Sequence, residues 1–160
     1  MNNNKILILV VSILACEMAG FIGSIFTTPA LSGWYASLNK PALTPPGWVF
    51  GVVWIALFFL IGVSLYLIWT SNNKDKKLMR NAVGIFIWQM VLNIWWSVIF
   101  FGIQSPFYAL IEIAFLWAAI LLNIIYFYRI SFRAGLLLLP YIFWVSFAAI
   151  LNFIFWRLNL

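Results

Sequence analysis

Hydrophobic and polar positions divide this chain into five extended apolar runs separated by short polar segments. A helix needs about 20 apolar residues to cross a hydrocarbon layer about 30 Å thick, and each run is that long. The pattern therefore predicts an all-α integral membrane protein built as a bundle of five transmembrane helices. The expected spans are residues 6–26, 46–69, 78–101, 106–128 and 134–156. They use most of the 160 residues, so we expect a single membrane domain over 1–160.

The segments between the runs differ in length. Residues 27–45 form a long segment that we expect to be non-helical, whereas residues 102–105 and 129–133 are expected to be short turns. Long loops are usually functional or disordered, and the apolar side chains of Trp34 and Tyr35 favour a docked loop over a disordered one. The first run is too long for the hydrophobic region of a signal peptide, which favours a membrane span there.

Composition and charge agree with a membrane protein. Hydrophobic residues make up 66% of the chain and charged residues 8%. A chain with this composition has too few polar side chains to cover a water-facing surface. The cations stand at the ends of the apolar runs, so the net charge of +6 indicates contact with the headgroups of a lipid bilayer, and we expect no nucleic acid partner.

The distribution of these cations predicts an orientation. In a five-span topology one side of the membrane carries only Lys40 and Arg157. The other side carries Lys5, Lys74, Lys76, Lys77, Arg80, Arg129 and Arg133. Because basic residues concentrate on the cytoplasmic side, we expect a multi-pass protein of the cell membrane with a cytoplasmic N-terminus. The long first loop and the C-terminus are then outside.

The residues available for catalysis are few. The chain has no histidine, one cysteine (Cys16), and only Glu17, Asp75 and Glu112 as carboxylates. We therefore expect no metal site and no cofactor, and hydrolase chemistry is disfavoured. Glu17 and Glu112 lie within predicted spans, where a carboxyl group is a functional candidate by default, and their roles stay open.

Tryptophan is abundant, at 10 of 160 residues. Indoles at span ends fit an interfacial belt, as for Trp48, Trp69 and Trp156. Trp54, Trp95 and Trp96 are intermediate in depth. The indoles of Trp88, Trp117 and Trp144 fall near mid-span, where each single ring is expected to pack between helices. As a set, however, they favour the lining of an aromatic cavity.

Other small and polar residues recur at helical spacing. Gln89, Asn93 and Ser97 share one face of the third span, which indicates either interhelical hydrogen bonds or a polar cavity wall. Small residues in the first span form two rows that predict close helix packing: Ala15, Ala19 and Gly23, and Ser12, Cys16, Gly20 and Ser24. The Gly47–Gly51 pair is compatible with a homodimer.

Three motifs resemble one known family. The first comprises Trp34-Tyr35-Ala36-Ser37-Leu38-Asn39-Lys40-Pro41, Pro45-Pro46, Phe50 and Trp54. The second comprises Leu92-Asn93-Ile94-Trp95-Trp96-Ser97 and Phe100-Phe101-Gly102. The third comprises Pro140-Tyr141-Ile142-Phe143-Trp144, Phe147-Ala148 and Leu151-Asn152. In order and spacing they are similar to those of the TspO/MBR family, which comprises tryptophan-rich sensory proteins of bacteria and the mitochondrial translocator protein.

The resemblance implies a five-helix bundle whose ligand pocket is closed by the first loop as a lid. It implies binding of tetrapyrroles such as protoporphyrin IX, and of benzodiazepine-site ligands such as PK11195, together with light-dependent porphyrin degradation that depends on Trp54 and Trp144. The ligand-binding residues implied by motif match are Tyr35, Pro45, Phe50, Val53, Trp54, Asn93, Trp96, Tyr108, Trp144, Ala148 and Leu151. Lys40 joins Tyr35 at the expected pocket mouth, where both would meet the porphyrin propionates.

Two further functions stay open on the sequence. One is a membrane carrier of small hydrophobic molecules, although no inverted repeat is visible. The other is a regulatory membrane protein that docks partners and whose aromatic residues only pack. Animal members of the family carry a cholesterol motif at the end of the fifth span, but Phe153 stands where that motif has tyrosine. Cholesterol transport is therefore not expected here.

Overall fold

A computed structural model describes residues 3–73 and 75–160. Within this part every regular element is a helix, and five helical segments are long and apolar enough to cross a membrane. They are α1 (Asn3–Leu31), α3 (Gly47–Trp69), α4 with the π-helical segment η1 (Lys76–Ser97 and Val98–Gly102), α5 (Pro106–Ile130), and α6 with α7 (Phe132–Leu137 and Leu139–Leu158). The predicted fold class is confirmed.

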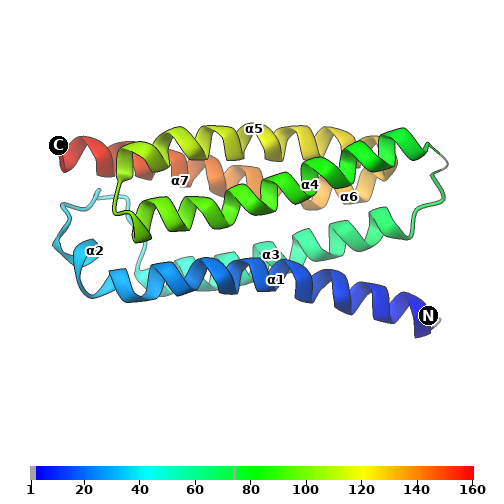
Figure 1. Cartoon of the computed structure of the whole chain (residues 1–160), viewed down its shortest axis with the longest axis horizontal. Coiled ribbons are helices and arrows are strands. Elements are labelled where there is room, and N and C mark those ends of the chain that lie inside the picture. The colour runs from blue at the N-terminus through cyan, green and yellow to red at the C-terminus, as the bar shows by residue number, and fades with distance from the viewer. Residues whose placement is uncertain (1–2, 74) are drawn as a thin grey trace.

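The helices run up and down, so that the connections gather at two ends of the bundle (Figure 1). We call the end with residues 32–46, residues 103–105 and the C-terminus the loop end. The opposite end holds the start of α1, residues 70–73 and 75, and the junction at Ser131. The basic residues predicted to lie on the cytoplasmic side belong to this opposite end, except Lys74, which lies outside the described residues.

The long first loop differs from its prediction. Residues 27–31 continue α1, with Pro29 inside the helix, and Trp34–Ser37 form a short helix, α2. A proline in a transmembrane helix is tolerated where neighbouring groups satisfy the freed backbone, so the apolar run continued as helix past the predicted end. The loop is therefore shorter and more ordered than the sequence suggested, and α3 begins at Gly47 after the proline pair.

A side-chain cap marks the start of α4, and a proline marks the start of α7. The Asp75 carboxylate accepts hydrogen bonds from the backbone N–H groups of Lys77 (3.0 Å) and Leu78 (2.9 Å), which starts α4. The turn expected over 129–133 is reduced to Ser131, because α5 continues to Ile130 and α6 begins at once. The last span is broken at Leu138, where Pro140 stands in the first turn of α7.

Packing is tightest toward the opposite end. A Cβ atom on Gly62 of α3 would lie 2.6 Å from the Cα atom of Ile13, so α1 and α3 touch backbone to backbone there. Ser64 of α3 donates a hydrogen bond to the Ala134 carbonyl oxygen (2.8 Å), which ties α3 to α6. These contacts leave the loop half of the bundle as the place where the helices separate.

Candidate ligand-binding site

A cavity of about 620 Å³ occupies the loop half of the bundle. Its walls come from α1, α3, α4 with η1, and α7, and Tyr35 of α2 closes it at the loop end. Ligand pockets for drug-sized molecules span roughly 300–1,000 Å³. On the side between α1 and α3, the lining residues Phe21 and Ile55 are also exposed at the surface of the bundle. The cavity is therefore open on this lipid-facing side.

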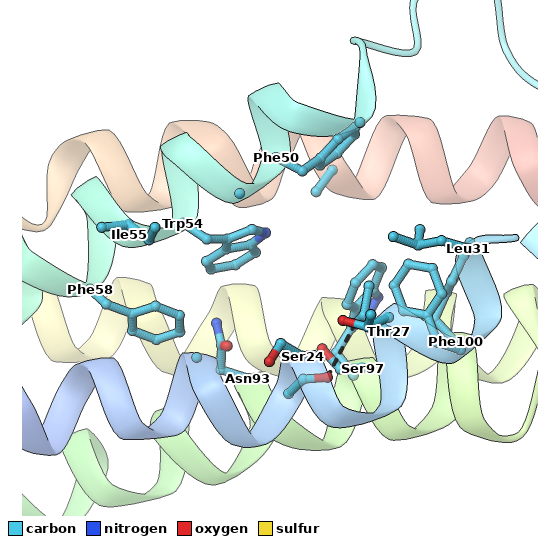
Figure 2. Close-up of a pocket in the computed structure, with 18 of the residues that line it drawn as sticks. Ser24, Thr27, Leu31, Phe50, Trp54, Ile55, Phe58, Asn93, Ser97 and Phe100 are labelled. Carbon is cyan, nitrogen blue, oxygen red and sulfur yellow. Dashed lines mark hydrogen bonds between the residues drawn. The ribbon is translucent and has the colours of Figure 1, made fainter.

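Aromatic side chains cover the α3 and α7 sides of the cavity (Figure 2). Trp54 stacks on Phe58 with ring centroids 5.5 Å apart, and Phe50 meets Trp144 edge-on at 5.7 Å. The Trp144 Nε1–H is buried and has no hydrogen-bond partner within the described residues. Because this N–H is buried even with the cavity empty, Trp144 meets the cavity with its ring and not with its N–H group.

The facing wall of α1 and α4 is more polar. Figure 2 shows Ser24, Thr27, Asn93 and Ser97 opposite the rings of α3. Asn93 Nδ2 donates to the Tyr141 hydroxyl oxygen at 2.8 Å. The cavity is thus a slot with one aromatic and one partly polar face.

Hydrogen bonds fix the indole of Trp96, which also lines the cavity. Its Nε1 donates to Asn152 Oδ1 at 3.1 Å, and Asn152 Nδ2 donates to the Pro106 carbonyl oxygen at 2.7 Å. This chain links α4, α7 and the start of α5. It holds Trp96 stacked on Phe100, with ring centroids 5.0 Å apart.

The first loop covers the cavity as a lid. Tyr35 packs against Phe101 at 5.7 Å and Phe155 at 5.5 Å between ring centroids, and this burial raises the pKa of its phenol. The hydroxyl group is therefore held in its neutral form. Lys40 Nζ lies 5.0 Å from the centroid of the Tyr35 ring, a cation–π contact at the mouth.

An amide pair fastens this lid to the C-terminus. Asn39 N–H donates to Asn159 Oδ1 at 2.9 Å, and Asn159 Nδ2 donates to the Asn39 carbonyl oxygen at 3.0 Å. Asn39 Nδ2 also donates to the Leu158 carbonyl oxygen at 3.3 Å. We call this reciprocal pair the amide latch.

Most predicted ligand-binding residues lie together in the cavity wall: Tyr35, Phe50, Trp54, Asn93, Trp96, Trp144, Ala148 and Leu151. The remaining four do not line it. Lys40 stands over Tyr35, Pro45 precedes α3, Val53 packs against the core of the bundle, and Tyr108 is 61% exposed on α5. The motif match thus located the site on α3, α4 and α7.

The contribution of α1 was missed. Glu17, Gly20, Ser24, Thr27 and Leu31 all line the cavity. The small residues of α1 were assigned to helix packing, which is correct for Gly20, where a Cβ atom would lie 2.6 Å from the Phe58 ring. Polar residues repeated every three or four positions along an apolar span were the available indication of a cavity face.

The mid-span indoles do not line the cavity as a set, so that prediction was wrong for two of the three. Trp88 is 59% exposed on the outer face of α4. Trp117 is 37% exposed and donates from Nε1 to Ser146 Oγ at 2.8 Å. Depth along a helix does not specify the face on which a ring lies, so only Trp144 of that set reaches the cavity.

The remaining predicted features have different positions. Gln89 is buried away from the cavity, whereas Asn93 and Ser97 line it. The polar face of the third span therefore lies partly in the helix packing and partly in the cavity wall. Gly47 and Gly51 face open space at the cavity edge, and the homodimer stays a prediction. Glu112 is buried on α5, outside the cavity wall, and its carboxyl oxygens have no partner within the described residues.

Comparison with known proteins agrees with this architecture. The sequence model of the TspO/MBR family matches residues 12–157. The chain is 45% identical to the tryptophan-rich protein TspO of Archaeoglobus fulgidus, over 97% of this chain and 99% of that protein. It is 34% identical to the human translocator protein (91% and 86%) and 31% identical to the tryptophan-rich sensory protein of Cereibacter sphaeroides (86% and 85%). With this similarity along nearly its whole length and five apolar helices, the chain belongs to the TspO/MBR family of multi-pass membrane proteins.

Proposed function

We propose that the protein binds porphyrins, protoporphyrin IX among them, and planar drug-sized ligands such as PK11195 in the loop-half cavity. The observation that carries this proposal is an aromatic slot of about 620 Å³ that the side chains leave unfilled. A tetrapyrrole is flat and apolar with carboxylates at one edge, so its faces match stacked indoles and phenyl rings.

The polarity of the slot favours one orientation of the porphyrin. Its rings would lie between the aromatic wall of Trp54 and Trp144 and the wall of α1 and α4. Its propionates would point toward the mouth, where Lys40 supplies the cation and Tyr35 a neutral hydroxyl donor.

We further propose that bound porphyrin is degraded in the light through Trp54 and Trp144. Both indoles line the slot, so an excited porphyrin held against them can take one electron from an indole ring, which leaves an indole radical cation and a porphyrin radical anion. Dissolved dioxygen is the oxidant that cleavage of the macrocycle then requires. This chemistry requires no acid–base residue, in keeping with a sequence that has no histidine.

Purified protein in phospholipid nanodiscs tests both parts. Protoporphyrin IX should quench tryptophan fluorescence saturably, and illumination should consume the porphyrin absorbance. In the double variant Trp54→Phe/Trp144→Phe, illumination should consume porphyrin far more slowly although porphyrin still binds. Phenyl rings keep the apolar faces of the slot but are poor electron donors.

Two outward indoles supply the matched control. Trp88 and Trp95 are each more than half exposed and do not line the cavity. The variant Trp88→Phe/Trp95→Phe should therefore degrade porphyrin at the parent rate. Equal degradation by the cavity double variant would remove the proposed role of Trp54 and Trp144, and an absence of saturable binding would remove the porphyrin proposal altogether.

The cellular use of this binding is proposed as sensing or transport at the cell membrane. Relatives named translocator protein and tryptophan-rich sensory protein suggest these uses. The cation distribution supports a cytoplasmic N-terminus, with the lid and the C-terminus outside. Ligand-dependent flux into sealed proteoliposomes would support transport. Its absence, with binding intact, would favour sensing.

A further inference from the structure

A carboxyl group stands on the cavity wall deep in the membrane. Glu17 is half-buried and lines the slot, as do Gly20, Ser24, Thr27 and Leu31 at helical spacing on the same face of α1. Fourteen residues separate Glu17 from Leu31 at the mouth, which is about 21 Å along a helix axis at 1.5 Å per residue. Glu17 therefore belongs to the deep end of the slot, far from the lid.

The polar wall between Glu17 and the lid offers acceptors more than donors. The Ser24 hydroxyl donates its proton to the Phe21 carbonyl oxygen (2.7 Å), and the Thr27 hydroxyl donates to the Gly23 carbonyl oxygen (3.2 Å). The Asn93 amide is likewise used as a donor, to Tyr141. The oxygens of these groups are left to accept, so the wall suits a ligand that brings its own N–H groups.

Aromatic rings line the cavity about one helical turn from Glu17. Phe58 packs directly against Gly20, one helical turn from Glu17, and Trp54 stacks on Phe58 at 5.5 Å. A carboxylate beside phenyl and indole rings is the combination that recognises an ammonium group, through a charge-assisted hydrogen bond and cation–π attraction.

The chain itself brings no cation to this end of the slot. None of the described residues that line the cavity is lysine or arginine. Lys40, the cation associated with the mouth, stands over Tyr35 at the lid. A carboxyl group in hydrocarbon without a partner is costly, so a ligand that supplies the missing charge gains an interaction that the empty cavity lacks.

We propose that the cavity also binds lipophilic arylalkyl amines, with the ring system in the slot and the protonated nitrogen on Glu17. This ligand class has the opposite charge to the porphyrin propionates, which are assigned to the mouth. The slot thus has a cationic end at the lid and an acidic end at mid-membrane. An amine dissolved in the bilayer reaches it through the side that is open between α1 and α3.

Three pyrene compounds with one ring system test the charge preference. They are 1-pyrenemethylamine, which is protonated at pH 7, neutral 1-pyrenemethanol and anionic 1-pyrenecarboxylate. Binding is measured at pH 7 in phosphatidylcholine nanodiscs, with protein-free nanodiscs subtracted to remove partition into lipid. The parent protein should bind the amine at least about tenfold more tightly than the alcohol, as one charge-assisted hydrogen bond allows. The carboxylate should bind most weakly.

Variants of the two intramembrane carboxyl residues assign the preference. Glu17→Gln should remove the tenfold difference by weakening the amine alone, while Glu17→Asp should retain it. Glu112→Gln is the matched control, because Glu112 is buried outside the cavity wall, and it should leave the difference unchanged. Alcohol binding serves as the test that each variant is folded.

The proposal is overturned if the parent binds amine and alcohol equally, or if the preference survives in folded Glu17→Gln. The parent comparison and Glu17→Asp decide even if Glu17→Gln does not fold. Porphyrin binding without an amine preference would refute this inference and leave the proposed function standing. An amine preference without porphyrin binding would support this inference and refute the proposed porphyrin binding.

Discussion

The two halves of the bundle use the same five helices in opposite ways. Toward the opposite end, Gly62 brings α3 against the backbone of α1, and Ser64 binds the backbone of α6. In the loop half, Phe50 and Trp54 of the same α3 face a cavity of about 620 Å³. The same helix therefore makes close backbone contacts through Gly62 and Ser64 where the bundle is closed, and presents aromatic rings to the cavity where the bundle is open.

This difference indicates how a membrane protein keeps a cavity. Lipid is as apolar as a leucine side chain, so burial of apolar surface does little to draw helices together, and close packing of small residues contributes instead. The closed half is well placed to hold the helices while the loop half keeps a space between rings. We expect mutations in the closed half to change stability and mutations in the loop half to change ligand binding.

The largest effect on stability is expected from Gly62→Ala. The added Cβ atom would lie 2.6 Å from Ile13 Cα, and backbone cannot yield as a side chain can. Overpacking of this kind costs roughly 1–3 kcal/mol, which thermal unfolding in detergent would detect. Gly51→Ala is the control, because nothing lies within 4 Å of its Cβ position, and it should leave the midpoint unchanged or slightly higher. Equal destabilisation by both changes would refute the division into halves.

A smaller effect, confined to binding, is expected from Ala148→Phe. Ala148 lines the slot beside Trp144, so the new ring would occupy space that a ligand needs. Affinity for protoporphyrin IX should fall about tenfold or more, equivalent to about 1.4 kcal/mol, with little change in thermal stability. Ala114→Phe places the same ring on the exposed face of α5 and should bind as the parent does. Unchanged affinity in Ala148→Phe would place the ligand elsewhere.

The smallest effect is expected from opening the amide latch. Asn159→Ala removes both hydrogen bonds between the Asn159 side chain and the Asn39 backbone. A net loss of about 1 kcal/mol from the closed lid would speed ligand release about fivefold in stopped-flow fluorescence. Ser37→Ala is the control, since the Ser37 hydroxyl bonds only locally, to the Trp34 carbonyl oxygen. A release rate that is the same in both variants would show that the latch does not limit exit.

Much of this architecture was predictable from the sequence. Five apolar runs predicted five spans because crossing hydrocarbon requires a fixed length of apolar helix. The predicted span of residues 46–69 agrees with the start of α3 at Gly47 to within one residue, and motif matches located the walls of α3, α4 and α7. The lid sequence around Trp34 and Tyr35 predicted a docked segment, although not its short helix.

The orientation of each helix was decided only by the tertiary structure. In a soluble protein the polar face of a helix marks its outside, but a membrane helix is apolar on the lipid side and on the protein side alike. Trp88 and Trp144 therefore look equivalent in sequence, yet one faces outward and the other lines the slot. Glu17 became a cavity residue only when α1 packed beside Phe58, a contact that depends on how helices distant in sequence fit together.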